Sequence, residues 1–250
     1  MDLRKFVIAE RNHRIVNPLT AEQLATLGSA LRLPSDSRVL DLACGKGEML
    51  GTWARDHRIT GVGVDLCAEF LDDARARAAE LGVTDRVSFV HGDAGGYVSE
   101  QPVDVAACVG AAWIGGGLTG TIALLERSLR PGGTVLVGEP YWRTPPTPEI
   151  VKGCLGDIDA SINTDYAVLP DLVERFHALG WDLVEMVLAD EAGWDRYIAE
   201  GWMAMREWLD EHPDDELSPT IRAELTSSQL MHTRYQRPYL GWGVFALRRR

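Results

Sequence analysis

Residues 39–48 of the 250-residue chain read Val-Leu-Asp-Leu-Ala-Cys-Gly-Lys-Gly-Glu. The apolar start of this stretch predicts a short buried strand over residues 38–43. Gly45 and Gly47 follow in the turn, and such glycines let a ligand approach the backbone because no Cβ stands in the way. A helix is predicted over residues 48–57. This strand, turn and helix together predict a ligand site at the carboxyl end of the first strand.

The rest of the chain continues to alternate between strand and helix patterns. Further strands are predicted at residues 59–65, 86–91, 103–109, 134–139, 181–188 and 239–247, and helices at 68–81, 118–130 and 170–179. This alternation predicts an α/β fold with a doubly wound, mostly parallel sheet covered by helices on both faces. Ligands of such sheets bind beyond the carboxyl ends of the strands.

The two ends of the chain depart from this alternation. Residues 1–34 are expected to form an N-terminal helical arm, whose helix begins at the capping box Thr20–Gln23 and stops before Pro34. Residues 193–231 have helical patterns in two pieces that break near Pro213. The arm and these two helices therefore lie outside the regular repeat of strand and helix.

Three successive predicted strands end in a carboxylate: Asp41, Asp65 and Asp93. Asp65 is placed to accept hydrogen bonds from both hydroxyls of a ribose, and Asp93 from the exocyclic amine of an adenine. Asp65 alone is equally well explained as a helix cap, but caps explain the three acids together poorly. A dinucleotide fingerprint requires a third glycine where Leu50 stands, which weakens an NAD interpretation.

With these residues the chain resembles the class I, Rossmann-like S-adenosylmethionine-dependent methyltransferases of the small-molecule type. The usual first motif of that group, VLDLGCGTG, stands here as VLDLACGKG, with Ala43 in place of the first glycine. The resemblance covers residues 36–140 and includes the LRPGG turn at residues 129–133. It implies S-adenosyl-L-methionine as cofactor and a seven-stranded sheet whose antiparallel seventh strand lies beside the sixth. Residues 193–231 are then a helical insertion between strands six and seven.

The same resemblance implies specific cofactor contacts and a division of the chain. The contacts are Asp41, Ala43, Gly45 and Gly47 on the methionine side, Asp65 at the ribose, Asp93 at the adenine amine, Leu66 and Ala94 against the adenine, and Val109 and Gly110 beside the sulfonium. One domain is expected over residues 1–250. Within it, residues 1–34 form the arm and its helix, residues 36–140 the cofactor-binding core, and residues 141–250 the substrate-side half.

The sequence indicates the residues that perform the methyl transfer less clearly than those that bind the cofactor. Methyl transfer is an in-line displacement that proximity and alignment accelerate, so a base is needed only if the acceptor must lose a proton. Glu139, His13 and Tyr141 are the catalytic candidates, and His232 is a further one. Each also has a structural explanation, since a lone histidine more often packs than reacts.

Tryptophans supply the candidates for substrate contact. Trp113 and Trp142 fall in predicted loops that can face an acceptor, where an aromatic wall holds a flat substrate or a cationic amine. Trp194, Trp202 and Trp208 follow one another at helical spacing, and we expect them to pack the insertion on the sheet. The insertion itself either covers the substrate or forms the surface of a homodimer.

The composition of the chain argues against nucleic acid, membrane and metal as partners. The net charge of −12 disfavours a nucleic-acid substrate, because phosphate backbones attract basic surfaces. No apolar run approaches a membrane span and no secretory signal stands at the start, so a cytoplasmic protein without membrane contact is expected. The four cysteines lack C-x-x-C spacing, and no acid cluster follows the fourth strand, so no metal is expected.

These patterns predict an enzyme that transfers a methyl group to a nitrogen or oxygen of a small molecule. Two alternatives remain open at this point. The same pocket serves chemistry other than methyl transfer in this fold, and a noncatalytic protein that binds S-adenosylmethionine has the same motifs.

Overall fold

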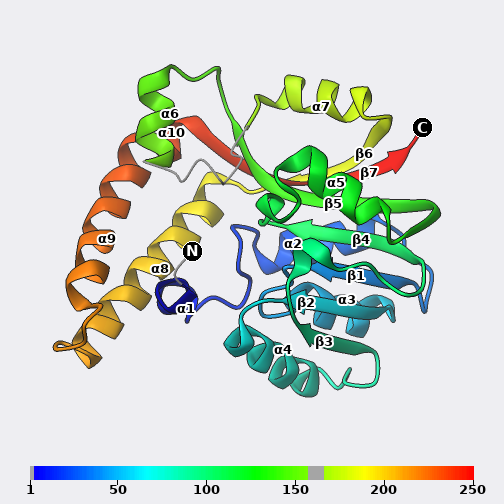
Figure 1. Ribbon diagram of the computed structural model, residues 1–250, viewed down its shortest axis with the longest axis horizontal. Helices are drawn as coiled ribbons and strands as arrows, with labels where there is room; N and C mark the ends of the chain where they lie inside the picture. The colour runs from blue at the N-terminus through cyan, green and yellow to red at the C-terminus, as the bar shows by residue number, and fades with distance from the viewer. Residues whose placement is uncertain (1–2, 157–165) are drawn as a thin grey trace.

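The structure, a computed structural model, describes residues 3–156 and 166–250. These residues contain a seven-stranded sheet with the strand order β3-β2-β1-β4-β5-β7-β6 (Figure 1). The strands are β1 (Arg38–Leu42), β2 (Thr60–Asp65), β3 (Val87–His91), β4 (Val103–Val109), β5 (Leu129–Trp142), β6 (Trp181–Leu188) and β7 (Leu240–Arg249). β7 runs antiparallel to both β5 and β6, whereas the other neighbouring strands pair in parallel. The expected α/β sheet with an inverted seventh strand is confirmed.

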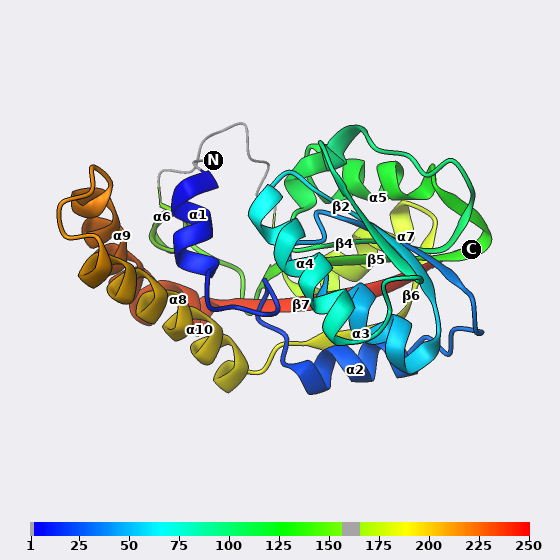
Figure 2. The ribbon, with the colours of Figure 1, turned by 90° about the horizontal axis from the view of Figure 1, so that it is seen from below.

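Helices cover both faces of the sheet. They are α1 (Leu3–Glu10), α2 (Ala21–Ala30), α3 (Glu48–His57), α4 (Ala68–Glu80), α5 (Leu118–Glu126), α6 (Pro148–Leu155), α7 (Leu169–Ala178), α8 (Glu191–Glu211), α9 (Ser218–Met231) and α10 (Arg237–Tyr239). α2 and α3 contribute to the apolar core on one face, and α5 and α7 to the core on the other (Figure 2). No helix in the described ranges is both long enough and apolar enough to cross a lipid bilayer.

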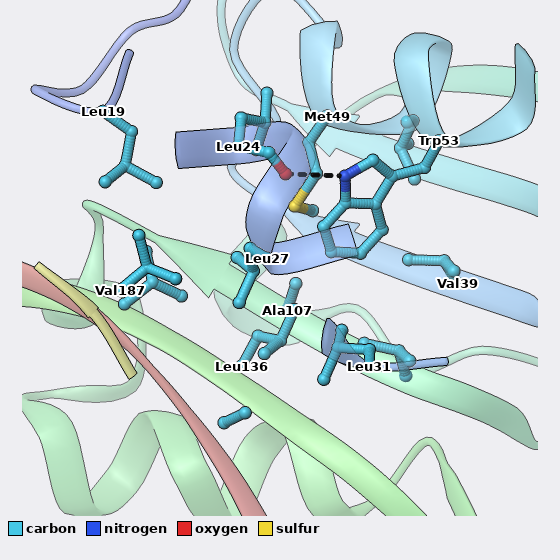
Figure 3. Packing of buried hydrophobic residues seen from close by; sticks show 14 of the residues in the cluster. Leu19, Leu24, Leu27, Leu31, Val39, Met49, Trp53, Ala107, Leu136 and Val187 are labelled. Atoms are coloured by element: carbon cyan, nitrogen blue, oxygen red, sulfur yellow. Dashed lines mark hydrogen bonds between the residues drawn. The ribbon is translucent and has the colours of Figure 1, made fainter. Parts of the chain in front are cut away.

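α2 is held in place by a cap and by one buried indole. The Thr20 side chain accepts a hydrogen bond from the Gln23 amide while the Gln23 side chain accepts one from Thr20, so the predicted capping box is present. The Trp53 Nε1 of α3 donates to the Leu24 carbonyl over 3.2 Å (Figure 3). A Cβ at Gly28 would lie 2.7 Å from that nitrogen, so the close approach of α2 to α3 requires a glycine there.

β5 is longer than predicted at both ends. The predicted helix over residues 118–130 ends at Glu126 because Leu129 already pairs with Val103 of β4, and the register then shifts before Thr134. Beyond residue 139 the strand continues to Trp142, which pairs with Leu240 of β7. The segment after residue 139 is therefore sheet rather than loop.

The predicted insertion between strands six and seven is confirmed. α8 and α9 flank the break expected near Pro213, and a π-helical turn at residues 232–236 and α10 connect them to β7. α1 lies between this insertion and α4 (Figure 2), and the Phe6 and Phe70 ring centroids are 5.5 Å apart. α6 was not predicted, although Thr147 caps it and Pro148 occupies its first turn, which is a recognisable helix start.

Candidate functional site

A cavity of about 450 Å³ opens at the carboxyl ends of the parallel strands, which is the size range of small-molecule sites. Its walls include most of the residues that sequence analysis assigned to the cofactor: Asp41, Ala43, Cys44, Gly45, Asp65, Leu66, Asp93, Ala94, Val109 and Gly110, of which Cys44 is an addition. Loops that are far apart in the chain meet here because parallel strands end at the same edge of the sheet. Of the predicted cofactor residues, Gly47 alone does not line the cavity in the part of the chain that the structure describes.

The glycine loop after β1 has an unusual backbone. Ala43, Gly45 and Gly47 have φ values of 59°, 54° and 68°, in the left-handed region. For an alanine this conformation costs roughly 1–2 kcal/mol, whereas glycine adopts it freely. At Gly47 a Cβ would also lie 2.6 Å from the ring of Phe89, so this glycine permits α3 to pack against β3.

Asp65 joins two of these loops. Its Oδ2 accepts a hydrogen bond from the Gly45 amide and its Oδ1 accepts one from the Cys67 amide, both over 2.8 Å. The carboxylate thus fixes the glycine loop and also caps the start of α4. A carboxylate has about four acceptor positions, so two remain for a ligand. Capping and ligand binding are therefore compatible functions of this residue.

Asp41 is a buried acid in the cavity wall whose pKa is strongly perturbed. Burial raises the pKa of its carboxyl well above the ordinary value of 3.8, and the negative charge of Asp65 raises it further. Both effects arise because a buried anion lacks solvent and has a second anion nearby. A cationic ligand beside Asp41 offsets both effects, so this end of the cavity is suited to a positively charged group.

The cavity wall also includes an acid after β3 and two exposed apolar side chains. Asp93 accepts a hydrogen bond from the Gly95 amide over 2.8 Å, which fixes the loop after β3. Leu66 is 57% exposed and Trp113 is 43% exposed, and both line the cavity. Large apolar side chains left in solvent at the mouth of a cavity are typical of a surface that a ligand covers.

The N-terminal arm, defined as residues 3–20, forms a wall that sequence analysis missed. Its cavity-lining residues are Leu3, Phe6, Arg14, Ile15, Val16, Asn17 and Leu19. Lys46, Glu48, Met49, Cys67 and Phe70 line the cavity too, together with Leu24, Leu27, Ala111, Ile114 and Val244. No motif marks the arm residues, because their position depends on the path of the arm over the sheet edge.

His13 lies in the arm but outside the described walls of the cavity. Its Nδ1 is 2.8 Å from Glu10 Oε2, and its Nε2 is 2.8 Å from the Tyr197 carbonyl oxygen. Burial lowers the pKa of His13, but Glu10, the Tyr197 carbonyl and the charge of Glu200 together outweigh burial and leave the pKa raised. Both ring nitrogens therefore face protein groups that attach the arm to α8. The geometry does not support His13 as the base that was expected.

Glu139, Tyr141 and Trp142 are buried in the sheet and are likewise absent from the described cavity walls. Glu139 was expected at the end of the fifth strand and Tyr141 and Trp142 after it, but the extension of β5 pairs all three with β7. Tyr141 belongs to one core cluster and Trp142 to the other. The geometry brings none of the three to the cavity, so the catalytic and substrate assignments expected for them lack support.

The remaining sequence candidates lie in the insertion. His232 is buried, with its Nε2 3.0 Å from Asp195 Oδ1. Trp194 packs in the main core as expected, whereas Trp208 packs with Ile8 of α1 in a separate small cluster, and Trp202 lies against that cluster. The expectation that the tryptophans pack is confirmed, but for the last two the partner is not the sheet.

Known proteins resemble this chain closely along its whole length. Residues 39–133 match a family described as a methyltransferase domain. A S-adenosylmethionine-dependent methyltransferase from Geobacter sulfurreducens, whose crystal structure contains S-adenosyl-L-homocysteine, is 58% identical and superposes with a TM-score of 0.94, covering 99% of this chain and 98% of that one. The chain belongs to the S-adenosylmethionine-dependent methyltransferases. The expected enzyme class and cofactor are thereby confirmed.

Two further proteins are similar to this methyltransferase over nearly its full length. One is a S-adenosylmethionine-dependent methyltransferase from Thiobacillus denitrificans, also crystallised with S-adenosyl-L-homocysteine, which is 55% identical with a TM-score of 0.93 and coverage of 99% and 98%. The other is the uncharacterized protein YjhP of Escherichia coli, 53% identical over 249 residues and 99% of each chain. None of these three relatives is named for a methyl acceptor.

Proposed function

We propose that this methyltransferase transfers the methyl group of S-adenosylmethionine to a nitrogen or oxygen of a small-molecule acceptor. The observation that carries the proposal is the cavity itself: its volume is about 450 Å³, and its walls include residues of both the N-terminal arm and the glycine loop. A cavity of this size accepts a small molecule beside a cofactor rather than a polymer. The net charge of −12 also supports a substrate other than nucleic acid.

The cofactor is proposed to lie along the acids at the strand ends. Asp41 would hold the ammonium of the methionine part, since that buried carboxylate gains from any nearby cation. Asp65 would hold the ribose hydroxyls with the acceptor positions that its two backbone bonds leave open. Asp93 would accept from the adenine amine while Leu66 and Ala94 flank the ring. Each of these side chains lines the cavity.

The transfer itself is proposed to depend on alignment. When bound, the cofactor supplies a methyl group on a positively charged sulfur, which Val109 and Gly110 would flank at the end of β4. The cavity there continues along apolar walls that include Leu19, Leu24 and Val244. These side chains exclude water and hold the acceptor in line, which is the main source of acceleration for a displacement of this kind.

The position of the charged groups favours a heteroatom over carbon as acceptor. The acids in the described cavity walls are Asp41, Glu48, Asp65 and Asp93, of which we assign Asp41, Asp65 and Asp93 to the cofactor. A nitrogen or oxygen acceptor attacks with its own lone pair, whereas a carbon acceptor without a nucleophilic double bond needs a base that removes its C–H proton. We propose that Trp113 contacts the acceptor or the cofactor at the cavity mouth.

Cofactor binding and acceptor binding are assigned to different parts of the chain. We propose that residues 36–140 hold the cofactor, as expected, and that the acceptor wall comes chiefly from the arm and α2 rather than from residues 141–250. Of that latter half, Val244 is the residue that lines the cavity in the described ranges. A homodimer remains a prediction, and light scattering of the purified protein measures it directly.

The experiment combines binding with product identification. Calorimetric titration with S-adenosylmethionine and with NAD should give micromolar binding of the first alone. Incubation of the enzyme and methyl-labelled cofactor with pools of small metabolites should then pass label to a compound whose methylated atom mass spectrometry and NMR identify. Label on carbon, or on protein or nucleic acid instead of a small molecule, would overturn the proposal.

A further inference from the structure

Lys46 occupies the middle of the glycine loop, where the usual motif VLDLGCGTG has threonine. It lines the cavity, yet only 6% of its surface is exposed to solvent. Lysine is seldom buried to this degree, because its ammonium needs partners that replace water. The partners of Lys46 are therefore informative about its function.

Three groups from two other parts of the chain surround the ammonium. Lys46 Nζ donates a hydrogen bond to the Arg11 carbonyl oxygen of the N-terminal arm over 2.9 Å. It lies 3.1 Å from Asp73 Oδ2 of α4 and 5.3 Å from the ring centroid of Phe70 on the same helix. Lys46 thus links the loop after β1 to both α4 and the arm.

The arm is attached on its other side to the insertion. Tyr197 of α8 donates a hydrogen bond to Glu10 Oε1 over 3.0 Å, and its carbonyl oxygen lies 2.8 Å from His13 Nε2. Arg11 pairs with Glu211 of α8 over 2.8 Å. The cavity-lining stretch of the arm, residues 14–17, follows directly after these attachments. The arm therefore spans from the insertion to the glycine loop, and Lys46 provides a contact at the loop end.

We propose that Lys46 is a positioning residue that couples cofactor binding to closure of the N-terminal arm over the cavity. Its neighbour Gly45 donates to Asp65, so a ligand held by Asp65 also fixes the loop that carries Lys46. With the loop fixed, the ammonium stays at the Arg11 carbonyl and the arm stays closed. Because coupling between two equilibria is reciprocal, arm closure must in turn strengthen cofactor binding. This inference rests on the cofactor site proposed above.

Side-chain length and charge make the proposal specific. Methionine at position 46 keeps most of the apolar stem but cannot donate to Arg11, and threonine restores the usual motif residue but is too short to reach the arm. Arginine keeps both the charge and a donor. We therefore expect Lys46→Arg to retain the coupling between cofactor binding and arm closure best, and Lys46→Met and Lys46→Thr to lose it.

The test measures binding and arm protection rather than turnover. S-adenosyl-L-homocysteine is titrated by calorimetry into wild type, Lys46→Met, Lys46→Thr and Lys46→Arg, and amide hydrogen exchange over residues 3–19 is recorded with and without it. In wild type the ligand should increase protection of the arm. Lys46→Met and Lys46→Thr should lose most of that increase and bind about 5- to 50-fold more weakly, the range for a hydrogen bond to a charged group acting through a partly coupled segment. Lys46→Arg should recover a large part of both.

A second variant on the arm distinguishes coupling from simple destabilisation. His13→Asn loosens the arm from α8, so adding Lys46→Met to it should weaken binding by less than the product of the two single effects. Lys152→Met makes the same chemical change at an exposed position of α6, outside the arm and the described cavity walls, and should leave affinity unchanged. Independent effects in the double variant would overturn the proposal, as would wild-type arm protection and affinity in Lys46→Met and Lys46→Thr.

Asp65→Ala separates this inference from the site on which it rests. If Asp65→Ala binds S-adenosyl-L-homocysteine as tightly as wild type, the proposed cofactor site is wrong and the coupling falls with it. If Asp65→Ala loses binding while the Lys46 variants retain normal arm protection and affinity, the site stands and only the coupling is wrong.

Discussion

The Gly45 amide donates a hydrogen bond to Asp65 Oδ2 over 2.8 Å, so the acid that ends β2 holds the glycine loop that ends β1. The bond joins two segments that sequence analysis connected only through an expected ligand. It also means that Asp65 shapes the cavity before any ligand enters. Substitution of this residue therefore affects both the loop and the ligand.

We expect Asp65→Ala to lower the affinity for S-adenosylmethionine by about 10- to 100-fold, since hydrogen bonds to a charged group contribute roughly 1.5–3 kcal/mol. Asp65→Asn keeps acceptor capacity on one oxygen and should lose less. Calorimetry of both variants measures the effect, with Asp72→Ala on the exposed surface of α4 as a control. Unchanged affinity in Asp65→Ala would remove this residue from the cofactor site.

Asp41→Asn should have opposite effects on stability and on binding. The pKa of Asp41 is raised in the folded protein, so between the ordinary value of 3.8 and the folded value the folded state binds a proton that the unfolded state lacks. Stability from this group is therefore fully present below 3.8 and is lost as the pH rises through the folded pKa.

Asparagine at position 41 cannot ionise, so the variant avoids the loss of stability that the wild type undergoes when Asp41 ionises. At neutral pH we therefore expect the ligand-free protein to gain about 1–3 kcal/mol of unfolding free energy. The same change should weaken cofactor binding, because a cationic group loses its partner. Urea unfolding at several pH values and calorimetry measure the two effects. A variant that is less stable than wild type at neutral pH, or that binds the cofactor equally well, would contradict the assignment.

Gly47→Ala should destabilise the protein strongly although Gly47 lies outside the described cavity walls. The alanine must adopt φ near 68° and its Cβ would meet the Phe89 ring at 2.6 Å. Gly132→Ala is the matched control, with φ of 75° and no atom within 4 Å of the added Cβ. We expect a loss of about 1 kcal/mol for Gly132→Ala and about 2–4 kcal/mol for Gly47→Ala in urea unfolding. Equal losses of unfolding free energy in the two variants would show that the Phe89 ring moves aside and that its contact with the added Cβ costs nothing.

Glu139→Gln is expected to leave turnover close to that of wild type. The carboxylate is buried at a paired position of β5, outside the described cavity walls in which we propose that the acceptor binds. Its charge instead contributes, after burial, to raising the pKa of Tyr166 to about 12. The kcat of the variant, once the acceptor is known, decides the matter: a fall of 10²- to 10⁴-fold, the usual contribution of a general base, would restore Glu139 as a catalytic residue.

The sequence by itself determined the order of the seven strands and of most helices between them, the glycine loop and the acids at the strand ends. These features are local: apolar periodicity selects strand or helix, and Gly45 and Gly47 adopt left-handed conformations that few other residues tolerate. The sheet then brings the acids together, because parallel strands end at one edge. For this reason the residues predicted to contact the cofactor largely line the cavity.

Only the tertiary structure decided which residues face the acceptor. Glu139 was expected to end a strand and Trp142 to lie in the loop after it, but pairing with β7 extends β5 through Trp142, and this pairing joins residues about 100 positions apart. The arm became a cavity wall through contacts of Lys46 with Arg11 and of His13 with Tyr197, which no local pattern encodes. Contacts between distant segments depend on how the whole chain packs, and they decide the shape of the acceptor site.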